Sequence, residues 1–216
     1  MRGKVLLLRR GTLLLILTAL VAAGIFMAVG GPSFVSASAA KRQLPIYSVE
    51  REEKVCAISF DAAWGNEDTQ QLIDILGKYN VKATFFVVGD WVDKYPESVK
   101  ALHDAGHEVM NHSNSHAHMS QLSSEAIVAD VEACNDKIEA VTGVRPTLIR
   151  PPYGEYDNNV ITSIRSIGME PIQWDVDSLD WKDYDADTIC QRVTSKLSPG
   201  SIVLFHNAAL HTPEAL

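Results

Sequence analysis

Two histidines four positions apart are the first residues of this sequence that could carry out chemistry. His112 and His116 lie in the segment NHSNSHAHM, which also holds His118. A spacing of four places two imidazoles on one side of a turn or helix, and imidazole is a common ligand of zinc and other first-row metals. A surface loop can also hold two histidines without a metal role. From the residues alone both interpretations stay open, and His118 is a bystander or a spare ligand.

Other ionisable residues stand where short apolar stretches end. Parallel strands open all their carboxyl ends on one face of a βα fold, so residues far apart in sequence meet there. Residues with a purely structural role would be scattered over both ends. The pattern therefore predicts an active site at one mouth of the fold. The residues that fit this pattern are Asp61, His112, Arg150, the acidic cluster of Asp175, Asp177 and Asp180, and His206.

The segment RPPYG at 150–154 has a restricted backbone, because two prolines fix φ while Gly154 permits an unusual turn. Such a loop can hold Arg150 against a carboxylate and present backbone N–H groups to an oxyanion. The alternative interpretation is a plain turn that carries a surface arginine.

Short apolar segments alternate with amphipathic ones, which predicts strands followed by helices. This alternation requires parallel pairing with right-handed crossovers, as in a βα barrel or a doubly wound sheet. No GxGxxG or phosphate-binding loop follows the first strand, so the usual nucleotide-binding reason for an open sheet is missing. Strands are predicted at 54–60, 82–88, 107–111, 147–150, 169–174 and 201–206, and helices at 67–79, 96–106, 125–143, 157–167 and 186–197.

The composition bounds the class of protein. The chain has 216 residues, of which 46% are hydrophobic, so it can bury one substantial core. Its net charge of −8 argues against a nucleic-acid partner, because phosphate neutralisation needs a clustered basic face. Cys56, Cys134 and Cys190 form no CxxC pair and are predicted to be small core residues.

The N-terminus predicts export. The basic segment MRGKVLLLRR precedes a long apolar run, which indicates a membrane anchor or signal segment at 1–31. A small-residue motif that ends at Ala39 is typical of a cleavage site. The domain is therefore expected outside the cytoplasm, either anchored to the membrane by the N-terminal helix or secreted after cleavage near Ala39. A spacer at 32–49 and a folded domain at 50–216 are expected to follow.

The C-terminus predicts a helix start. Thr212-Pro213-Glu214 offers a capping hydroxyl, a proline at the first helical position and an acid in the first turn. The chain ends at Leu216, so we expect the domain to be truncated and to lack its final helix or more.

Five segments together resemble a known family. ISFDAAWG, HSNSH, RPPYG, DSLDW and IVLFH are similar, in order and approximate spacing, to the five motifs of the polysaccharide deacetylase family. This family is also called carbohydrate esterase family 4 or the NodB-homology domain, and the chain most resembles its sporulation-associated PdaB-like branch. The resemblance implies a distorted (β/α) barrel with fewer than eight strands. It also implies metal-assisted hydrolysis of N-acetyl groups on an amino-sugar polymer, a peptidoglycan-like or chitin-like glycan.

The resemblance also implies roles for single residues. The metal would be a divalent ion, zinc first, with cobalt or another first-row metal as an alternative. Carried over by position, Asp61 matches the catalytic base, His112 and His116 match the metal ligands, and Arg150 matches the residue that orients the base. Tyr153 matches a backbone N–H donor to the oxyanion, Trp181 a residue that lines the sugar groove, and Leu204 the wall that receives the acetyl methyl group. His206 matches the general acid, and Asp180, or less well Asp177, matches the acid that tunes this histidine.

One position departs from the family pattern. The family has a second aspartate, a third metal ligand, where this chain has Ala62. The site could then bind metal through two histidines and water, recruit a nearby acid such as Glu67 or Asp68, or bind none. The leading hypothesis is a metal-dependent deacetylase of an envelope glycan. The alternative is a non-catalytic or weakly active glycan-binding relative with a structural role in the envelope. A plain membrane-anchored scaffold would leave the clustering at the strand ends unexplained.

Overall fold

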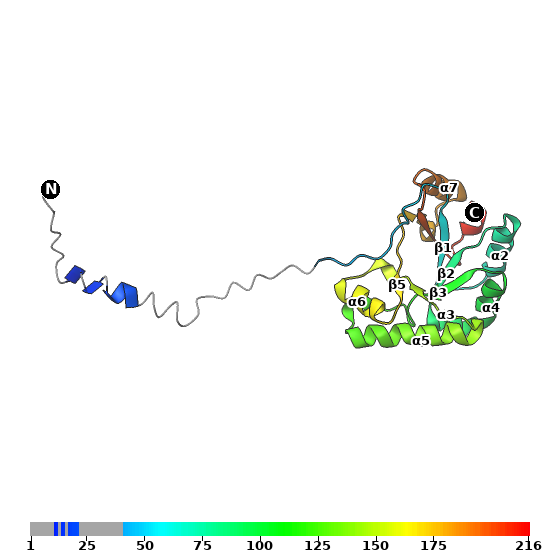
Figure 1. Ribbon diagram of the computed structural model, residues 1–216. Coiled ribbons are helices and arrows are strands. Elements are labelled where there is room, and N and C mark those ends of the chain that lie inside the picture. Colours follow the sequence, from blue (N-terminus) through cyan, green and yellow to red (C-terminus); the bar gives the residue numbers. More distant parts are fainter. Residues whose placement is uncertain (1–10, 13, 16, 22–40) are drawn as a thin grey trace. The chain divides into compact units, whose positions relative to one another are not determined.

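The computed structural model describes residues 11, 12, 14, 15, 17–21 and 41–216 (Figure 1). The chain divides into two compact units, Met1–Lys41 and Arg42–Leu216. Most of the predicted N-terminal segment 1–31 and the predicted cleavage site near Ala39 lie outside the described residues. Among the helices of the described residues, none combines the length and the apolar character needed to span a bilayer.

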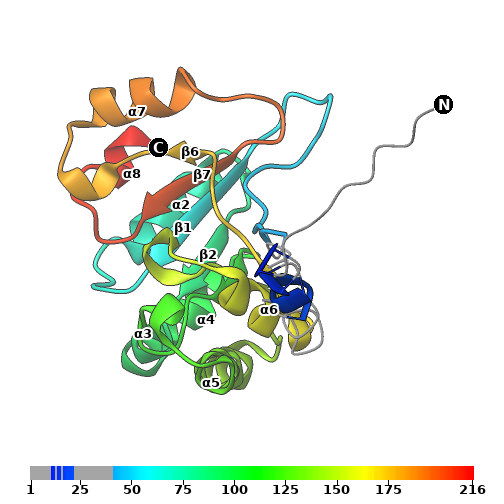
Figure 2. The same ribbon diagram turned by 90° about the vertical axis from the view of Figure 1, so that its left-hand side faces the viewer.

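The strands of the second unit form one parallel sheet of seven strands in the order β5-β4-β3-β2-β1-β7-β6. The sheet curls into a partial barrel (Figure 2), which confirms the predicted α/β class and the distorted (β/α) barrel with fewer than eight strands. The strands are β1 (Ala57–Ala62), β2 (Thr84–Val87), β3 (Glu108–Asn111), β4 (Leu148–Ile149), β5 (Glu170–Pro171), β6 (Val176–Asp177) and β7 (Ile202–His206).

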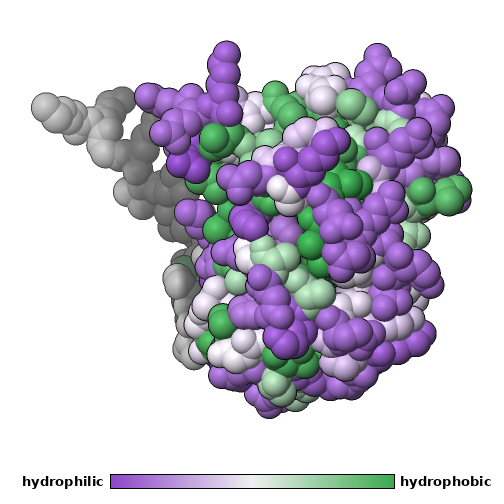
Figure 3. All heavy atoms as spheres, turned by 90° about the vertical axis from the view of Figure 1, so that its right-hand side faces the viewer, coloured by the Kyte–Doolittle hydropathy of each residue, from purple (hydrophilic) through white to green (hydrophobic). Residues whose placement is uncertain are grey.

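Amphipathic helices cover the outer face of the sheet. The main core cluster joins β1, β2 and β7 to apolar side chains such as Leu72, Val99 and Ile138 from three of these helices. Hydrophilic residues cover most of the outward face on the side of the helices at 69–78 and 96–104 (Figure 3). The helices are α2 (Thr69–Lys78), α3 (Gly89–Lys94), α4 (Pro96–Asp104), α5 (Ser124–Thr142), α6 (Asn158–Ser166), α7 (Ala186–Thr194) and α8 (Thr212–Ala215).

Local sequence explains where several helices begin and end. The side chains of Ser123, Asp157 and Asp185 accept hydrogen bonds from backbone N–H groups in the first turns of α5, α6 and α7. Gly143 ends α5 in the left-handed conformation, and Asn80 has a positive φ just after α2.

Some predicted elements differ from the structure. The predicted strand 169–174 contains only the short β5, and α3 and β6 were not predicted. Cys134 is buried as expected, but Cys56 and Cys190 are exposed, so the core prediction was wrong for these two. Cys56 precedes β1. The buried residues of α7 are Ile189 and Val193, so Cys190, which follows Ile189, lies on the outer face of that helix.

A segment before β1 belongs to the barrel, although a spacer was predicted at 32–49. Ile46 pairs with Ile172 after β5, and Ser48 pairs with Ser201 before β7. Val49 and Gly200 lie so close that a Cβ on Gly200 would fall 1.7 Å from the Val49 carbonyl oxygen. The compact unit thus begins at Arg42, ahead of the predicted boundary at residue 50.

Candidate active site

The strand ends bring the predicted site residues together. Asp61 and His206 are paired in register on the neighbouring strands β1 and β7, and His112 and Arg150 directly follow β3 and β4. Asp61, His112 and His206 line a pocket of about 450 Å³. Its lining residues are Asp61, Ala63, Trp64, His112, His116, Tyr153, Trp174, Asp177, Trp181, Leu204, His206 and Asn207.

Arg150 holds Asp61 from behind the pocket. Nη1 of Arg150 donates to Oδ1 of Asp61 at 2.7 Å, and both side chains are buried. Burial raises the pKa of Asp61, but the charge and hydrogen bond of Arg150, with further contributions from His112 and His206, hold it below its ordinary value. Asp61 is therefore ionised at neutral pH, the form that a general base requires.

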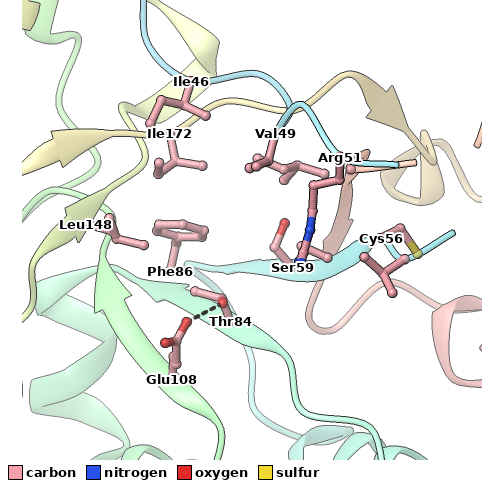
Figure 4. Close-up of a pocket in the computed structure, with 14 residues that line it drawn as sticks. Ile46, Val49, Arg51, Cys56, Ser59, Thr84, Phe86, Glu108, Leu148 and Ile172 are labelled. Atoms are coloured by element: carbon pink, nitrogen blue, oxygen red, sulfur yellow. Dashed lines mark hydrogen bonds between the residues drawn. The ribbon is translucent and has the colours of Figure 1, made fainter. Parts of the chain in front are cut away.

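Arg150 is itself supported from the opposite end of the barrel. Nη2 of Arg150 donates to Ser59 Oγ at 2.8 Å, and its guanidinium lies 4.2 Å from the centroid of the Phe86 ring. Ser59 in turn donates to the Val203 carbonyl oxygen at 2.6 Å. Figure 4 shows Ser59 and Phe86 in the wall of a second, mainly apolar pocket of about 400 Å³. Arg150 therefore bonds to one residue of the candidate active site, Asp61, and to one residue of this second pocket, Ser59.

The two predicted metal ligands lie next to each other. The ring centroids of His112 and His116 are 5.0 Å apart. Nδ1 of His112 donates to the Arg150 carbonyl oxygen at 2.7 Å, which leaves Nε2 with its lone pair, 3.5 Å from Oδ2 of Asp61. Nδ1 of His116 is buried and has no hydrogen-bond partner in the described part of the chain.

Both imidazoles are in the state that binds a metal. Burial lowers the pKa of His112, and burial together with the neighbouring His112 lowers the pKa of His116 to about 4. Both rings are neutral at neutral pH, as a metal ligand must be.

A third protein ligand is missing from this set. Ala62 packs in the core, Glu67 accepts from the backbone N–H of Asn66, and Asp68 accepts from that of Ala208. Neither acid lines the pocket. In residues 41–216 and the described part of 11–21, no group of three or more His, Cys, Asp or Glu side chains is suited to hold a metal ion. His112 and His116 fit a metal as two ligands, and they would hold it less firmly than the three ligands of a usual catalytic site.

On the other side of the pocket, His206 is held by Asp180. Nδ1 of His206 donates to Oδ1 of Asp180 at 2.8 Å, and the backbone N–H of His206 donates to Oδ2 at 2.7 Å. Asp177 instead accepts from the backbone N–H of Leu179, so Asp180 is the partner of the histidine. Burial lowers the pKa of His206, but Asp180 and Asp61 outweigh this and raise it above its ordinary value.

Thr212 completes this arrangement and was given a different role by the sequence. It was predicted to cap the last helix, but α8 begins at Thr212 and follows His211, which makes no side-chain cap. The Thr212 hydroxyl donates to Oδ2 of Asp180 at 2.7 Å. No local pattern could have shown this contact, because the two residues are 32 positions apart.

Aromatic rings surround the mouth of the pocket. Tyr153, in the left-handed conformation at φ +61, and Trp181 are more than half exposed, while Leu204 forms a buried wall. His118 lies outside this pocket and stacks on Tyr153 with ring centroids 4.1 Å apart. Trp64 also lines the pocket, and sequence analysis did not single it out, although it lies in the segment FDAAWG.

Known proteins are similar to this chain in sequence. The peptidoglycan-N-acetylmuramic acid deacetylase PdaC of Bacillus subtilis is 38% identical over 160 residues, which cover 74% of this chain and 34% of that protein. The peptidoglycan-N-acetylglucosamine deacetylase of Bacillus cereus is 34% identical over 151 residues, which cover 70% of this chain and 55% of that protein. The chain therefore spans roughly a third to just over half of the length of these relatives.

A solved structure and a family profile extend the comparison. A carbohydrate esterase family 4 pseudoenzyme from Bacillus anthracis superposes with a TM-score of 0.77 and 38% identity, covering 80% of this chain and 61% of that one. The profile of the polysaccharide deacetylase family matches residues 48–172, more than half of the chain. Together with the partial barrel and the residues gathered at its mouth, this match shows that the chain belongs to the polysaccharide deacetylase family.

Proposed function

We propose that this protein is a hydrolase that removes N-acetyl groups from an amino-sugar polymer of the cell envelope, a peptidoglycan-like glycan. The observation that carries the proposal is the pairing of Asp61 with His206 in register on adjacent parallel strands. Side chains in register on neighbouring strands point to the same face, so a base and an acid face the same pocket. The names of the two curated relatives, both peptidoglycan deacetylases, support a glycan of this kind.

The side chains divide the work of amide hydrolysis. Asp61, kept ionised by Arg150, takes a proton from the water that attacks the acetyl carbon. As the carbon–nitrogen bond breaks, His206 gives its proton to the leaving nitrogen, so the products are acetate and a free amine. Leu204 offers an apolar wall of the pocket to the acetyl methyl group. We assign Tyr153, a pocket-lining residue of the RPPYG loop, as the donor of a backbone N–H to the oxyanion.

We assign His112 and His116 as the residues that would hold a divalent metal ion, zinc in the first place. When bound, such an ion would lower the pKa of the attacking water and polarise the acetyl carbonyl. The neutral imidazoles and the unpartnered Nδ1 of His116 support this assignment. Because the third ligand position is taken by Ala62, we expect weak metal binding.

A second candidate function is glycan binding without efficient hydrolysis. It is favoured by Ala62 and by the similarity to a pseudoenzyme of the same family. The pairs Asp61–Arg150 and His206–Asp180 favour the enzyme, because a binding protein gains little from a base and an acid that are each held by a buried partner.

The two candidates differ in whether acetate is released. The full chain would be incubated with acetylated peptidoglycan fragments or N-acetylglucosamine oligomers, with added zinc or cobalt and with a chelator. We expect metal-stimulated acetate release that Asp61→Asn and His206→Ala each reduce by about 10²-fold or more. Acetate at the level of these variants in every metal would reject the enzyme and leave the glycan-binding protein.

We further propose that the domain works outside the cytoplasmic membrane, attached by the N-terminal segment or released from it. The basic residues before the apolar run at 11–31 support this orientation. Protease added to intact cells should digest a tag fused after Leu216. A tag that becomes accessible only after lysis would contradict this location.

A further inference from the structure

The pocket drawn in Figure 4 lies where the strands of the barrel begin, and the proposed hydrolysis does not use it. Its lining residues come from the segment 46–59, from the starts of β2, β3, β4 and β7, and from Ile172 just after β5. We call it the amino-end pocket. Its volume of about 400 Å³ falls within the range of roughly 300–1,000 Å³ that is usual for small-molecule sites.

The inner face of the barrel runs from this pocket to the candidate active site. Side chains alternate along β1, so Ala57, Ser59 and Asp61 share the inner face. Ala57 and Ser59 line the amino-end pocket, whereas Asp61 lines the active-site pocket. Strand β7 repeats this order, with Ile202 in the first pocket and His206 in the second. The two pockets therefore lie toward opposite ends of the same strands and share no lining residue.

Aliphatic side chains and one aromatic ring supply most of the wall of the amino-end pocket. Figure 4 shows Ile46, Val49, Leu148, Ile172 and the Phe86 ring around it. Apolar surface of a ligand that is placed against these groups leaves water, which is the main favourable contribution to binding in such a site. The pocket therefore suits a ligand with a long apolar part.

The segment before β1 is fixed to the barrel and forms a permanent part of this wall. The backbone N–H of Ile46 donates to the Pro171 carbonyl oxygen at 3.0 Å, and that of Val49 donates to the Gly200 carbonyl oxygen at 2.9 Å. The N–H of Gly200 donates in turn to the Val55 carbonyl oxygen at 2.8 Å. The pocket is therefore formed before a ligand arrives, which reduces the entropy lost on binding.

The two charged side chains of the pocket lie on different walls. Arg51 reaches in from the segment before β1, and Glu108 stands at the start of β3 (Figure 4). The Glu108 carboxylate accepts the Thr84 hydroxyl at 2.8 Å. Arg51 pairs with Glu53 at 3.0 Å, and the two side chains are 49% and 73% exposed. Such an exposed ion pair contributes little free energy, so the Arg51 guanidinium can bind the anionic group of a ligand.

An apolar cavity with one cation at its edge suits a molecule with an apolar body and one anionic end. The Ser59 hydroxyl inside the pocket already donates to the Val203 carbonyl oxygen and accepts from Arg150, so the acidic end is better placed at Arg51. We propose that the amino-end pocket binds a fatty acid of medium length, with its alkyl chain against the apolar wall and its carboxylate on the guanidinium of Arg51. This site is separate from the proposed hydrolysis and does not depend on it.

Two ligands that differ only at the polar end test the role of the arginine. The affinities of the full chain for decanoate and for 1-decanol would be measured by calorimetry, below the concentration at which decanoate forms micelles. Arg51→Met should weaken decanoate binding about tenfold and 1-decanol binding less than about twofold, because only the acid loses a charged partner. Lys78→Met is the control, because Lys78 is an exposed cation on α2 that does not line the pocket.

A larger side chain inside the pocket tests where the ligands bind. Ala57→Phe places a ring in the cavity and should weaken the binding of both ligands about tenfold or more. Ala140→Phe adds the same ring at an exposed position of α5 and should leave both affinities unchanged. The melting temperature of each variant shows whether it is folded, and Arg51→Met, which alters an exposed side chain, keeps the test decisive if Ala57→Phe does not fold.

Each outcome bears on the site without reference to acetate release. A wild-type protein that does not bind decanoate would overturn the proposal. Equal decanoate affinity in wild type and a folded Ala57→Phe variant would also overturn it, because the ligand would then bind elsewhere on the protein. Equal losses of decanoate and 1-decanol binding in Arg51→Met would reject the carboxylate at Arg51. Loss of both ligands in Ala57→Phe, together with loss of decanoate alone in Arg51→Met, would uphold the fatty-acid site.

Discussion

Nη1 of Arg150 lies 2.7 Å from Oδ1 of Asp61, and the arginine is fully buried. The two residues are 89 positions apart, so only the barrel brings them together. Each charge is removed from water and depends on the other for compensation.

Removing the arginine should therefore leave an uncompensated buried carboxylate. We expect Arg150→Met to lower the free energy of unfolding by about 3 kcal/mol or more, measured by urea denaturation. Arg165→Met is the control, because Arg165 pairs with Glu170 at the surface, and it should cost less than about 1 kcal/mol. Equal losses in the two variants would show that the buried pair has no special role.

Ser59 is expected to position Arg150 against the base. Ser59→Ala removes the acceptor of Nη2 and should let the guanidinium shift away from Asp61. Arg150 lowers the pKa of Asp61, so a looser contact should raise this pKa and move the acid limb of acetate release to higher pH. The titration of the Asp61 carboxyl carbon by NMR checks the first step independently of activity.

Two matched variants accompany this experiment. Ser59→Thr keeps the hydroxyl and should titrate like the wild type. Ser163→Ala removes another buried serine, which lies on α6, and should leave Asp61 unchanged. The idea fails if the alanine and threonine variants at position 59 titrate alike.

Asp180 should determine the alkaline limb of the pH profile, the pH above which acetate release declines. His206 donates a proton only when it is protonated, and its raised pKa extends this state to higher pH. Asp180→Asn removes the charge that raises this pKa, so acetate release should fall at a lower pH than in the wild type. At pH 8 we expect a loss of about tenfold or more.

Variants around the same carboxylate separate its role from a general loss of charge. Asp177→Asn removes a neighbouring acid that does not bond to His206 and raises its pKa only through its charge, so the alkaline limb should shift less than in Asp180→Asn. Thr212→Val should shift the limb in the same direction as Asp180→Asn but less, because it removes one of the donors to Asp180. A larger shift in Asp177→Asn than in Asp180→Asn would contradict the assignment.

Ala62→Asp should convert a weak metal site into a strong one. A carboxylate at this buried position destabilises the fold when it has no partner, so in the presence of a chelator the variant should melt at a lower temperature than the wild type. Zinc should raise its melting temperature well above the chelator value and should bind at least about a hundredfold more tightly than to the wild type. Ala62→Asn has a side chain of the size of aspartate without the charge, so zinc should neither raise its melting temperature nor bind it more tightly than the wild type. Equal zinc affinity in both variants would mean that position 62 does not reach the metal.

The sequence by itself determined the class of fold and most members of the site. Alternating apolar and amphipathic segments require parallel strands, and parallel strands gather Asp61, His112, Arg150 and His206 at one mouth. These inferences succeed because hydrophobic periodicity and strand ends are local properties of the chain. The predicted helix at 125–143 belongs to the same group, because Ser123 and Gly143 cap it with local contacts.

Only the tertiary structure decided the partners. The sequence favours Asp180 over Asp177 only through the family resemblance, and the segment that follows β6 brings the Asp180 carboxylate to His206. Thr212, predicted as a helix cap, instead donates to Asp180, and Cys56 and Cys190 are exposed. Glu67 and Asp68 accept hydrogen bonds from backbone N–H groups and do not join the two histidines as ligands. Such outcomes depend on side-chain direction and on distances between residues far apart in the chain, which no local pattern encodes.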